Sequence, residues 1–149
     1  MKAVTVRQPW AWAIMHAGKD VENRTRNIAG TYRGPLIIHA AKGYDEEDFP
    51  GFLNALLHLG VARPRGEDLH LGSALGIVDL VDVHDALTCQ DAIPVNALES
   101  EWVTCSPWGE FDVQHLVMAN PRPFADPIPY RGQLGLWEFP DDLLPEEFR

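Results

Sequence analysis

The segment GKDVENRTR, residues 18–26, brings together ionisable side chains of both signs. Lys19, Arg24 and Arg26 surround Glu22, directly after an apolar stretch. A guanidinium group binds phosphate or carboxylate through two parallel hydrogen bonds. A lysine beside other cations can lose its proton near neutral pH, and a carboxylate can activate water or carry a proton. The segment therefore predicts a polar ligand site with the groups needed for hydrolysis, the alternative being a solvated edge strand whose charges pair with one another.

The spacing of these residues suits an extended strand. In a strand, alternate side chains share one face at about 6.6 Å intervals, so the even-numbered residues of 20–26, Glu22 and Arg24 among them, are predicted to face the ligand. The odd-numbered residues, including Thr25, are predicted to face the other way. Lys19 falls at the corner between the preceding helix and this strand, where its flexible stem can reach over Glu22.

The distribution of charge indicates a local anion site. The chain of 149 residues has a net charge of −10, but residues 1–42 carry net +5 and the remainder carries net −15. This asymmetry favours a small anion or a few phosphates as ligand. It argues against long duplex DNA, which requires an extended basic surface. The alternative is that the N-terminal cations pair with the acidic remainder within the fold.

Hydrophobic periodicity predicts an α+β fold in a single domain, residues 1–149. Pro9 suits a helix start and Gly18 a helix stop. Residues 86–110 show no strong hydrophobic periodicity, which predicts a long loop with a short helix near 95–103. Residues 120–132 are rich in proline and are predicted to form a bend. The irregular alternation of elements favours a small mixed β-barrel with two or three flanking helices. The predicted strands are 3–7, 35–41, 74–84, 110–118 and 133–139, and the predicted helices are 9–17, 45–60 and a short one in the acidic tail 141–149.

Several classes of protein are disfavoured by composition. The N-terminus lacks the apolar region of a signal peptide, and no apolar stretch is long enough to cross a bilayer. Cys89 and Cys105 form no C-x-x-C pattern and the six histidines are scattered, so the sequence predicts no metal site and no cofactor. We expect a cytoplasmic protein without a membrane partner, and the sequence leaves its oligomeric state open.

Four further residues are candidates for contacts with a ligand. Arg7 and Gln8 precede the first predicted helix, whose N-terminus attracts anions. Trp108, in the loop CSPWGEF, is the best candidate among five tryptophans for stacking on a base, whereas Trp10 and Trp137 fit the core. His39 ends a predicted strand. For Arg7, Gln8 and His39 an ordinary structural role is an equal or stronger alternative.

The whole chain resembles the ASCH domain, a branch of the PUA-like superfamily. The resemblance rests on four blocks in order, VRQPWAWAIMHAGKDVENRTR, GPLIIHAAK, GIVDLVDV and YRGQLGLWEF, and extends over roughly residues 3–139. The signature G-x-K-x-x-E-x-R stands here as Gly18, Lys19, Glu22 and Arg24. The resemblance implies a PUA-like β-barrel with flanking helices and a cleft beside the first helix that holds RNA or a nucleotide.

The resemblance also implies two kinds of activity. Some bacterial members look like amidohydrolases that remove acetyl from N(4)-acetylcytidine with a lysine, a threonine three positions later and a distant glutamate. Others resemble RNA-binding or RNA-cleaving proteins. Here Glu22 stands in place of the threonine, so a hydroxyl nucleophile does not carry over. For the distant glutamate, the sequence offers Glu99, Glu101 and Glu110 without ranking them.

The leading hypothesis is a small hydrolase of a modified nucleoside, a nucleotide or RNA. Lys19 and Glu22 are its predicted catalytic residues, and neighbouring cations are expected to keep Glu22 ionised and limit its basicity. The alternative is a non-catalytic module that binds RNA, a nucleotide or a protein partner. The predicted substrate-binding residues are Arg24, Arg7, Gln8, Arg26, Trp108 and His39.

Overall fold

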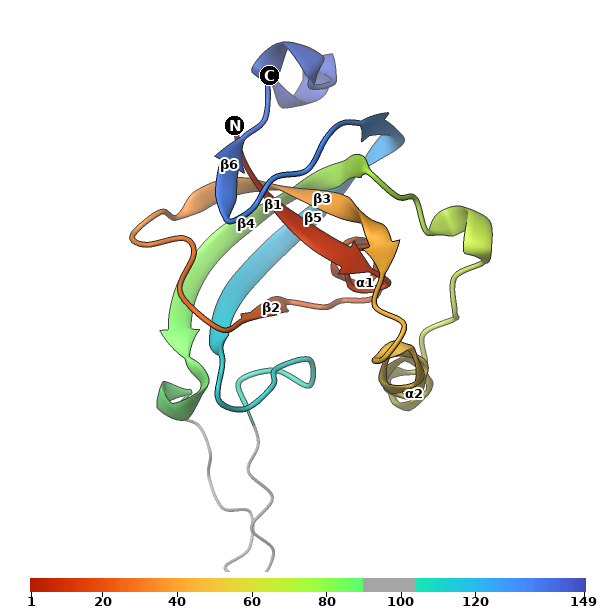
Figure 1. Cartoon of the computed structure of the whole chain (residues 1–149), viewed down its shortest axis with the longest axis vertical. Helices are drawn as coiled ribbons and strands as arrows, with labels where there is room; N and C mark the ends of the chain where they lie inside the picture. Colours follow the sequence, from red (N-terminus) through yellow and green to blue (C-terminus); the bar gives the residue numbers. More distant parts are fainter. Residues whose placement is uncertain (90–103) are drawn as a thin grey trace, which may run out of the picture.

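A computed structural model describes residues 1–89 and 104–149, which form a mixed sheet with two helices (Figure 1). The predicted α+β class with two flanking helices is therefore confirmed. The described elements also include four single 3₁₀ turns, two of which lie in the acidic tail where a short helix was predicted. The strands are β1 (Lys2–Gln8), β2 (Val21–Arg24), β3 (Gly34–Tyr44), β4 (Ser73–Asp85), β5 (Gln114–Pro129) and β6 (Leu136–Glu138), and the helices are α1 (Trp10–His16) and α2 (Phe49–Leu59).

The six strands form one sheet in the order β2-β5-β4-β3-β1-β6. β1 and β3 run parallel, and the other neighbouring strands are antiparallel. The sheet curves strongly (Figure 1), yet its end strands β2 and β6 do not pair with each other, so the predicted closure into a barrel is not confirmed. β6 covers only residues 2–4 of β1, which leaves the rest of that edge of β1, from Thr5 onward, facing β2 across a gap.

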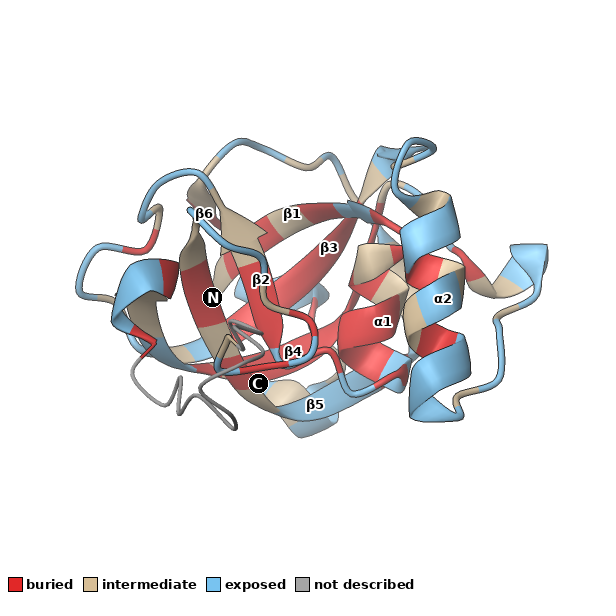
Figure 2. Cartoon of the chain, turned by 90° about the horizontal axis from the view of Figure 1, so that it is seen from below, coloured by how far each residue is buried: buried red, intermediate tan, exposed pale blue. Residues whose placement is uncertain are grey.

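Both faces of the sheet are covered by apolar side chains. Successive side chains of a strand point to opposite faces, and in β3 Leu36 and Ile38 join one buried cluster while Ile37 joins another. The helix α1 packs on the first of these faces, and α2 packs on α1, with the exposed side of α2 turned to solvent (Figure 2). α2 ends at Gly60, whose left-handed backbone (φ +66°) glycine adopts without steric cost.

The packing of α1 on the sheet depends on a glycine in β4. A Cβ atom at Gly76 would lie 2.6 Å from the Met15 sulfur and 2.5 Å from the Arg122 carbonyl oxygen, so only glycine allows this close approach. α1 is thereby fixed against β4 and β5, and the turn at its C-terminal end is held in one place. That turn leads directly into Lys19 and β2.

The proline-rich segment after residue 119 is a strand and not the predicted bend. β5 continues to Pro129, with irregular register against β4. A central strand is hydrogen-bonded to a neighbour on each side, and a proline, which lacks the N–H, cannot donate to either neighbour. β2 pairs with β5 only over Gln114–Val117, so the later part of β5 lies at an edge of the sheet where a missing donor is tolerated.

Two other predictions have separate outcomes. The predicted short helix at 95–103 lies outside the described residues. Among the residues that are described, no helix is long and apolar enough to span a membrane.

Candidate functional site

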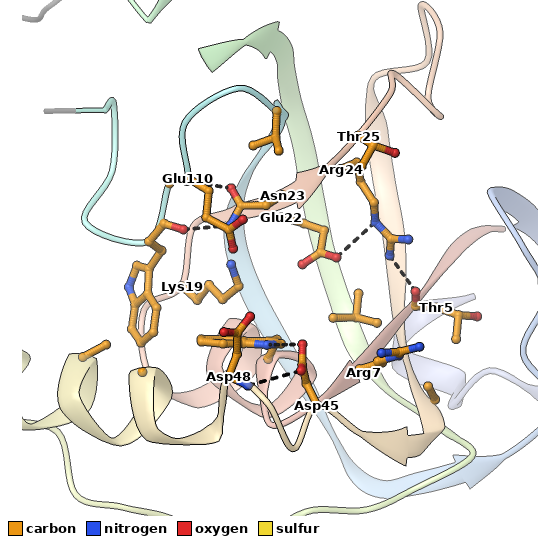
Figure 3. A pocket seen from close by; sticks show the side chains of 18 of the residues that line it. Thr5, Arg7, Lys19, Glu22, Asn23, Arg24, Thr25, Asp45, Asp48 and Glu110 are labelled. Carbon is orange, nitrogen blue, oxygen red and sulfur yellow. Dashed lines mark hydrogen bonds and ion pairs between the residues drawn. The ribbon is translucent and has the colours of Figure 1, made fainter. Parts of the chain in front are cut away.

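The main cleft of the described structure lies at the gap where the sheet does not close. Its volume is about 960 Å³, and it is lined mainly by β1, β2, the first residue of α1, the turn after α1, the loop before α2 with part of that helix, and residues 107–110 and 133–135 (Figure 3). An open sheet edge presents unpaired backbone groups and room for a ligand. The cleft therefore exists because β1 and β2 face each other without pairing through their backbones.

Lys19 is buried at the inner end of this cleft. α1 stops at Gly18, which takes a left-handed conformation (φ +70°), and the N–H of Lys19 then bonds the carbonyl oxygen of Ala13 at 3.1 Å. The side chain is 4% exposed, and Nζ donates to the carbonyl oxygen of Val21 at 2.5 Å. Burial lowers the pKa of Lys19, and the nearby carboxylate of Glu22 opposes that shift.

Glu22 is the second buried ionisable group of the cleft. It lies on β2, paired with Leu116 of β5, and is 8% exposed. Burial raises the pKa of Glu22, and Lys19 and Arg24 oppose the rise without cancelling it. The neighbouring cations thus limit the basicity of Glu22, as the sequence led us to expect, but burial of the carboxylate, which the sequence did not indicate, acts in the opposite direction and is the larger cause.

Arg24 bridges the gap between the two sheet edges. Its Nη2 donates to the carbonyl oxygen of Thr5 on β1 at 2.6 Å, and its Nε lies 3.1 Å from Oε1 of Glu22 (Figure 3). Nε makes this ion pair without a hydrogen-bonding geometry, and among the described residues it has no hydrogen-bond partner. The guanidinium thus holds β2 near β1, and its buried Nε faces the carboxylate of Glu22.

Glu110 supplies a second carboxylate near Lys19. Asn23 of β2 donates through Nδ2 to the Glu110 carboxylate at 3.3 Å and accepts the N–H of Glu110 at 3.1 Å. The negative charge of Glu110 acts on both Lys19 and Glu22. Of the three glutamates that the sequence offered as the distant carboxylate, Glu110 lies in the cleft, and Glu99 and Glu101 lie outside the described residues.

Two tryptophan rings flank the lysine. Nζ of Lys19 lies 5.5 Å from the ring centroid of Trp10 and 6.0 Å from that of Trp108. The rings meet edge to face at 6.4 Å, and Nε1 of Trp10 donates to Asp45 at 3.2 Å. Trp108 lines the cleft but is only 7% exposed and belongs to the buried cluster that includes Phe52, whereas Trp10, which the helical periodicity assigned to the core, is partly exposed and lines the cleft as well. Trp10 is only partly buried and its indole N–H has a polar partner, so the ring can pack on the core with one side and line the cleft with the other.

The other predicted substrate-binding residues divide into two groups. Arg7 lines the cleft, whereas Gln8, Arg26 and His39 do not. Gln8 is fully buried and accepts the N–H of Trp12 at 2.9 Å while donating to the carbonyl oxygen of His70 at 2.8 Å, so its contacts support the start of α1. His39 is buried beside Trp137 and bonds the carbonyl oxygen of Tyr130.

The predicted alternation of residues 20–26 holds only in part. Glu22 and Arg24 line the cleft as expected, but Asn23 and Thr25 also line it. β2 ends at Arg24, so strand geometry no longer sets the direction of the next side chain. Asp20 does not line the cleft, and its carboxylate accepts a hydrogen bond from the hydroxyl group of Ser106.

The cleft is of mixed charge, contrary to the cationic concentration that the N-terminal sequence suggested. Its lining combines three cations with four carboxylates, namely Arg7, Lys19 and Arg24 with Glu22, Asp45, Asp48 and Glu110. A groove for a polyphosphate backbone is usually lined by cations in excess. This lining instead suits a ligand with hydrogen-bonding groups and little net charge.

Fold and site together define an α+β protein whose main described cleft sits at the open side of a curved mixed sheet. The sequence model of the ASCH domain matches residues 4–127, which is most of the chain, so the chain belongs to the ASCH domain family. The resemblance found in the sequence is thereby confirmed. The ASCH domain is generally regarded as an RNA-binding module, and in this chain its signature residues Lys19, Glu22 and Arg24 meet in one cleft.

Proposed function

We propose that the cleft binds a modified nucleoside, free or within single-stranded RNA, and hydrolyses an amide on its base. The observation that carries this proposal is the burial of Lys19 beside Glu22. A module that only binds RNA needs an open cationic groove, and desolvating a lysine and a glutamate together costs stability that such binding does not require. Perturbed pKa values of paired groups in a cleft are typical of acid–base catalysis.

Each of the ionisable groups has a role in this reaction. The carboxylate of Glu22 lies near Lys19, and its pKa is raised by burial. It takes a proton from water as the water oxygen attacks the acyl carbon. The ammonium group of Lys19 stabilises the negative charge that develops on the acyl oxygen. When the bond between the acyl carbon and the base nitrogen breaks, that nitrogen receives the proton held by Glu22. The products are the free carboxylic acid and the unmodified base.

The size and lining of the cleft support a nucleoside as ligand. A volume of about 960 Å³ lies within the range of small-molecule sites. Trp10 and Trp108 present aromatic rings beside Lys19, and the side chain of Arg24, which is 27% exposed, lines the cleft with a positive charge. The balance of charges favours a neutral base and ribose over a run of phosphates.

A turnover screen tests this proposal. The purified protein is incubated with N(4)-acetylcytidine, other N-acylated nucleosides and short unmodified RNAs, and the products are separated by chromatography and identified by mass. We expect release of the acyl group from at least one nucleoside. The variant Lys19→Met, which keeps the apolar stem, should abolish that release, and the matched variant Lys42→Met, on the exposed part of β3 and outside the cleft, should not.

The outcomes of the screen are distinct. Binding of nucleosides or RNA without turnover would overturn catalysis and leave a binding module. Cleavage of the RNA backbone would replace amide hydrolysis with ribonuclease activity. If the protein neither binds nor turns over any of these compounds, a nucleoside is not its ligand. The protein-interaction module that the sequence also allowed would then remain.

A further inference from the structure

Four side chains with metal-binding atoms converge at one end of the sheet, away from the cleft lining. They are His84 near the end of β4, Cys89 after the following 3₁₀ turn, Cys105 before β5, and His115 at the start of β5. One ligand atom from each lies within 4.8 Å of all the others. The sequence predicted no metal site because these residues are scattered, with gaps of 5, 16 and 10 positions, and the sheet brings them together.

The two histidines are placed by strand pairing. His84 and His115 are direct partners in the antiparallel ladder of β4 and β5, so their side chains project from the same face. Their ring centroids lie 5.5 Å apart at a steep angle. This region is where the end of β4 and the start of β5 lie side by side (Figure 1). The ladder therefore fixes half of the ligand set.

The sulfur atoms complete a compact four-atom set. Sγ of Cys89 lies 2.8 Å from Nε2 of His84 and 3.1 Å from Nδ1 of His115, and Sγ of Cys105 lies 3.4 and 3.3 Å from the same two nitrogens. With zinc bonds of about 2.3 Å to sulfur and 2.0–2.1 Å to nitrogen, a tetrahedral site has sulfur–nitrogen edges of about 3.5 Å. Small outward movements of the four side chains would reach that geometry.

The outer nitrogen of each imidazole is already occupied. Nδ1 of His84 lies 2.7 Å from the carboxylate of Asp82, and Nε2 of His115 lies 2.7 Å from the carbonyl oxygen of Glu110. Both acceptors require a proton on the ring nitrogen that faces them, so each neutral ring turns a lone pair toward the two sulfurs. Carboxylate and backbone carbonyl partners of this kind are the usual support of histidines bound to a metal.

We propose that His84, Cys89, Cys105 and His115 form a structural site for one Zn²⁺ ion. Two thiolates and two imidazoles in tetrahedral arrangement select zinc among the common divalent ions. Four protein ligands leave no open position, as expected for a structural and not a catalytic ion. Both thiols release their protons to solvent on binding. The two cysteines are free in this structure, so both sulfurs are available as ligands.

The site would hold in place one side of the cleft. Cys105 and His115 flank the segment that carries Trp108 and Glu110, and the carbonyl oxygen of Glu110 bonds His115. Gly109 lies so close to His115 that a Cβ atom would be 2.9 Å from its ring. Binding energy at a metal site of this type contributes directly to folding of the segments that it joins. Zinc would therefore order residues 104–110 against β5.

Metal analysis of the reduced protein tests the proposal. We expect one equivalent of zinc per chain by elemental mass spectrometry, and Co²⁺ added to metal-free protein should give the visible absorption of a tetrahedral site with a thiolate charge-transfer band. Cys105→Ser, at an exposed position that tolerates change, should lose both signals. His58→Ala, an exposed histidine of α2, should keep both. Asp82→Asn should keep the stoichiometry but weaken zinc affinity by about 10–100-fold.

Three results would overturn the proposal. The first is reduced protein that contains no zinc and gives no cobalt spectrum. The second is an intact mass two hydrogens lighter than the free-thiol form that persists with fresh reductant, which would indicate a disulfide between Cys89 and Cys105. The third is unchanged zinc affinity in Cys105→Ser. Activity on nucleosides plays no part in these measurements, so their failure is separate from that of the proposed hydrolysis.

Discussion

Replacing Arg24 with glutamine removes the cation closest to Glu22 and keeps a side chain of similar length. The ion pair between Nε of Arg24 and Oε1 of Glu22 measures 3.1 Å, and it opposes the rise in the pKa of Glu22 caused by burial. Without this cation the pKa of Glu22 should rise further. The change isolates one electrostatic contribution in a cleft where Lys19 is kept.

The size of the effect follows from the distance. Two unit charges at 3.1 Å interact by about 5 kcal/mol at an effective dielectric constant of about 20. The guanidinium is 27% exposed, so solvent screening reduces this interaction. We therefore expect the pKa of Glu22 to rise in Arg24→Gln, because Lys19 is then the main cation left to oppose the effect of burial.

An NMR titration of protein labelled with ¹³C at the glutamate carboxyl groups measures this pKa directly, with the Glu22 signal assigned from its loss in Glu22→Gln. Arg65→Gln is the matched control, because Arg65 is exposed and pairs with Glu67 and Asp68 away from the cleft. Titration of Glu22 at the same pH in wild type and Arg24→Gln would refute the reasoning, since the ion pair would then not exist in solution.

The same variant should show a pH-dependent loss of stability. Well below the ordinary pKa of a glutamate, Glu22 is protonated in both the folded and unfolded chains, and it carries no charge whose burial would cost free energy. As pH rises, the unfolded chain loses this proton first, so the folded state becomes less favourable until Glu22 ionises there too. The deficit of Arg24→Gln relative to wild type in urea unfolding should therefore be smaller near about pH 4 than near about pH 7. A deficit that is constant with pH would contradict this.

Three further changes separate the roles of neighbouring residues. Thr25→Val should leave the rate of hydrolysis almost unchanged. The intact mass of the wild-type protein during turnover should show no acyl adduct, and an adduct on a hydroxyl group would instead support a mechanism with a hydroxyl nucleophile. Trp108→Ala should weaken nucleoside binding by about 1–3 kcal/mol in titration calorimetry. An affinity equal to that of the wild type would show that the Trp108 ring does not contact the nucleoside. Gln8→Ala should lower the free energy of unfolding by about 1–3 kcal/mol, because Gln8 is fully buried and its loss leaves the Trp12 N–H without its acceptor and the His70 carbonyl oxygen without its donor. Loss of nucleoside binding at unchanged stability would instead show that Gln8 contacts the ligand.

The sequence predicted those parts of the fold that follow local patterns. The period-2 alternation of residues 3–7 and the apolar run of residues 35–41 are strands, and Gly18 and Gly60 follow the two helices in left-handed conformations. The strand at the proline-rich segment was missed because composition does not reveal that β5 is paired on one side only beyond residue 118. Closure of the sheet, likewise, depends on which distant strands pair.

The candidate site was predicted in the same uneven way. Lys19, Glu22 and Arg24 are close in sequence and form the signature of the family that the chain resembles, so they could be predicted to lie together. Trp10 was assigned to the core because helical periodicity does not distinguish a buried ring from one that lines a cleft. The thiol and imidazole cluster around His115 depends on strand register between β4 and β5, which no short motif encodes.

The most direct test of the central claim is a single-turnover assay of N(4)-acetylcytidine, with enzyme in excess, comparing wild type and Glu22→Gln. Glutamine keeps the shape of the side chain and removes the base. We expect the rate of acetate release to fall by about 10²–10⁴, with nucleoside affinity retained. Equal rates in the two proteins, or no acetate release by wild type despite tight binding, would contradict the assignment of Glu22 and Lys19 as a catalytic pair.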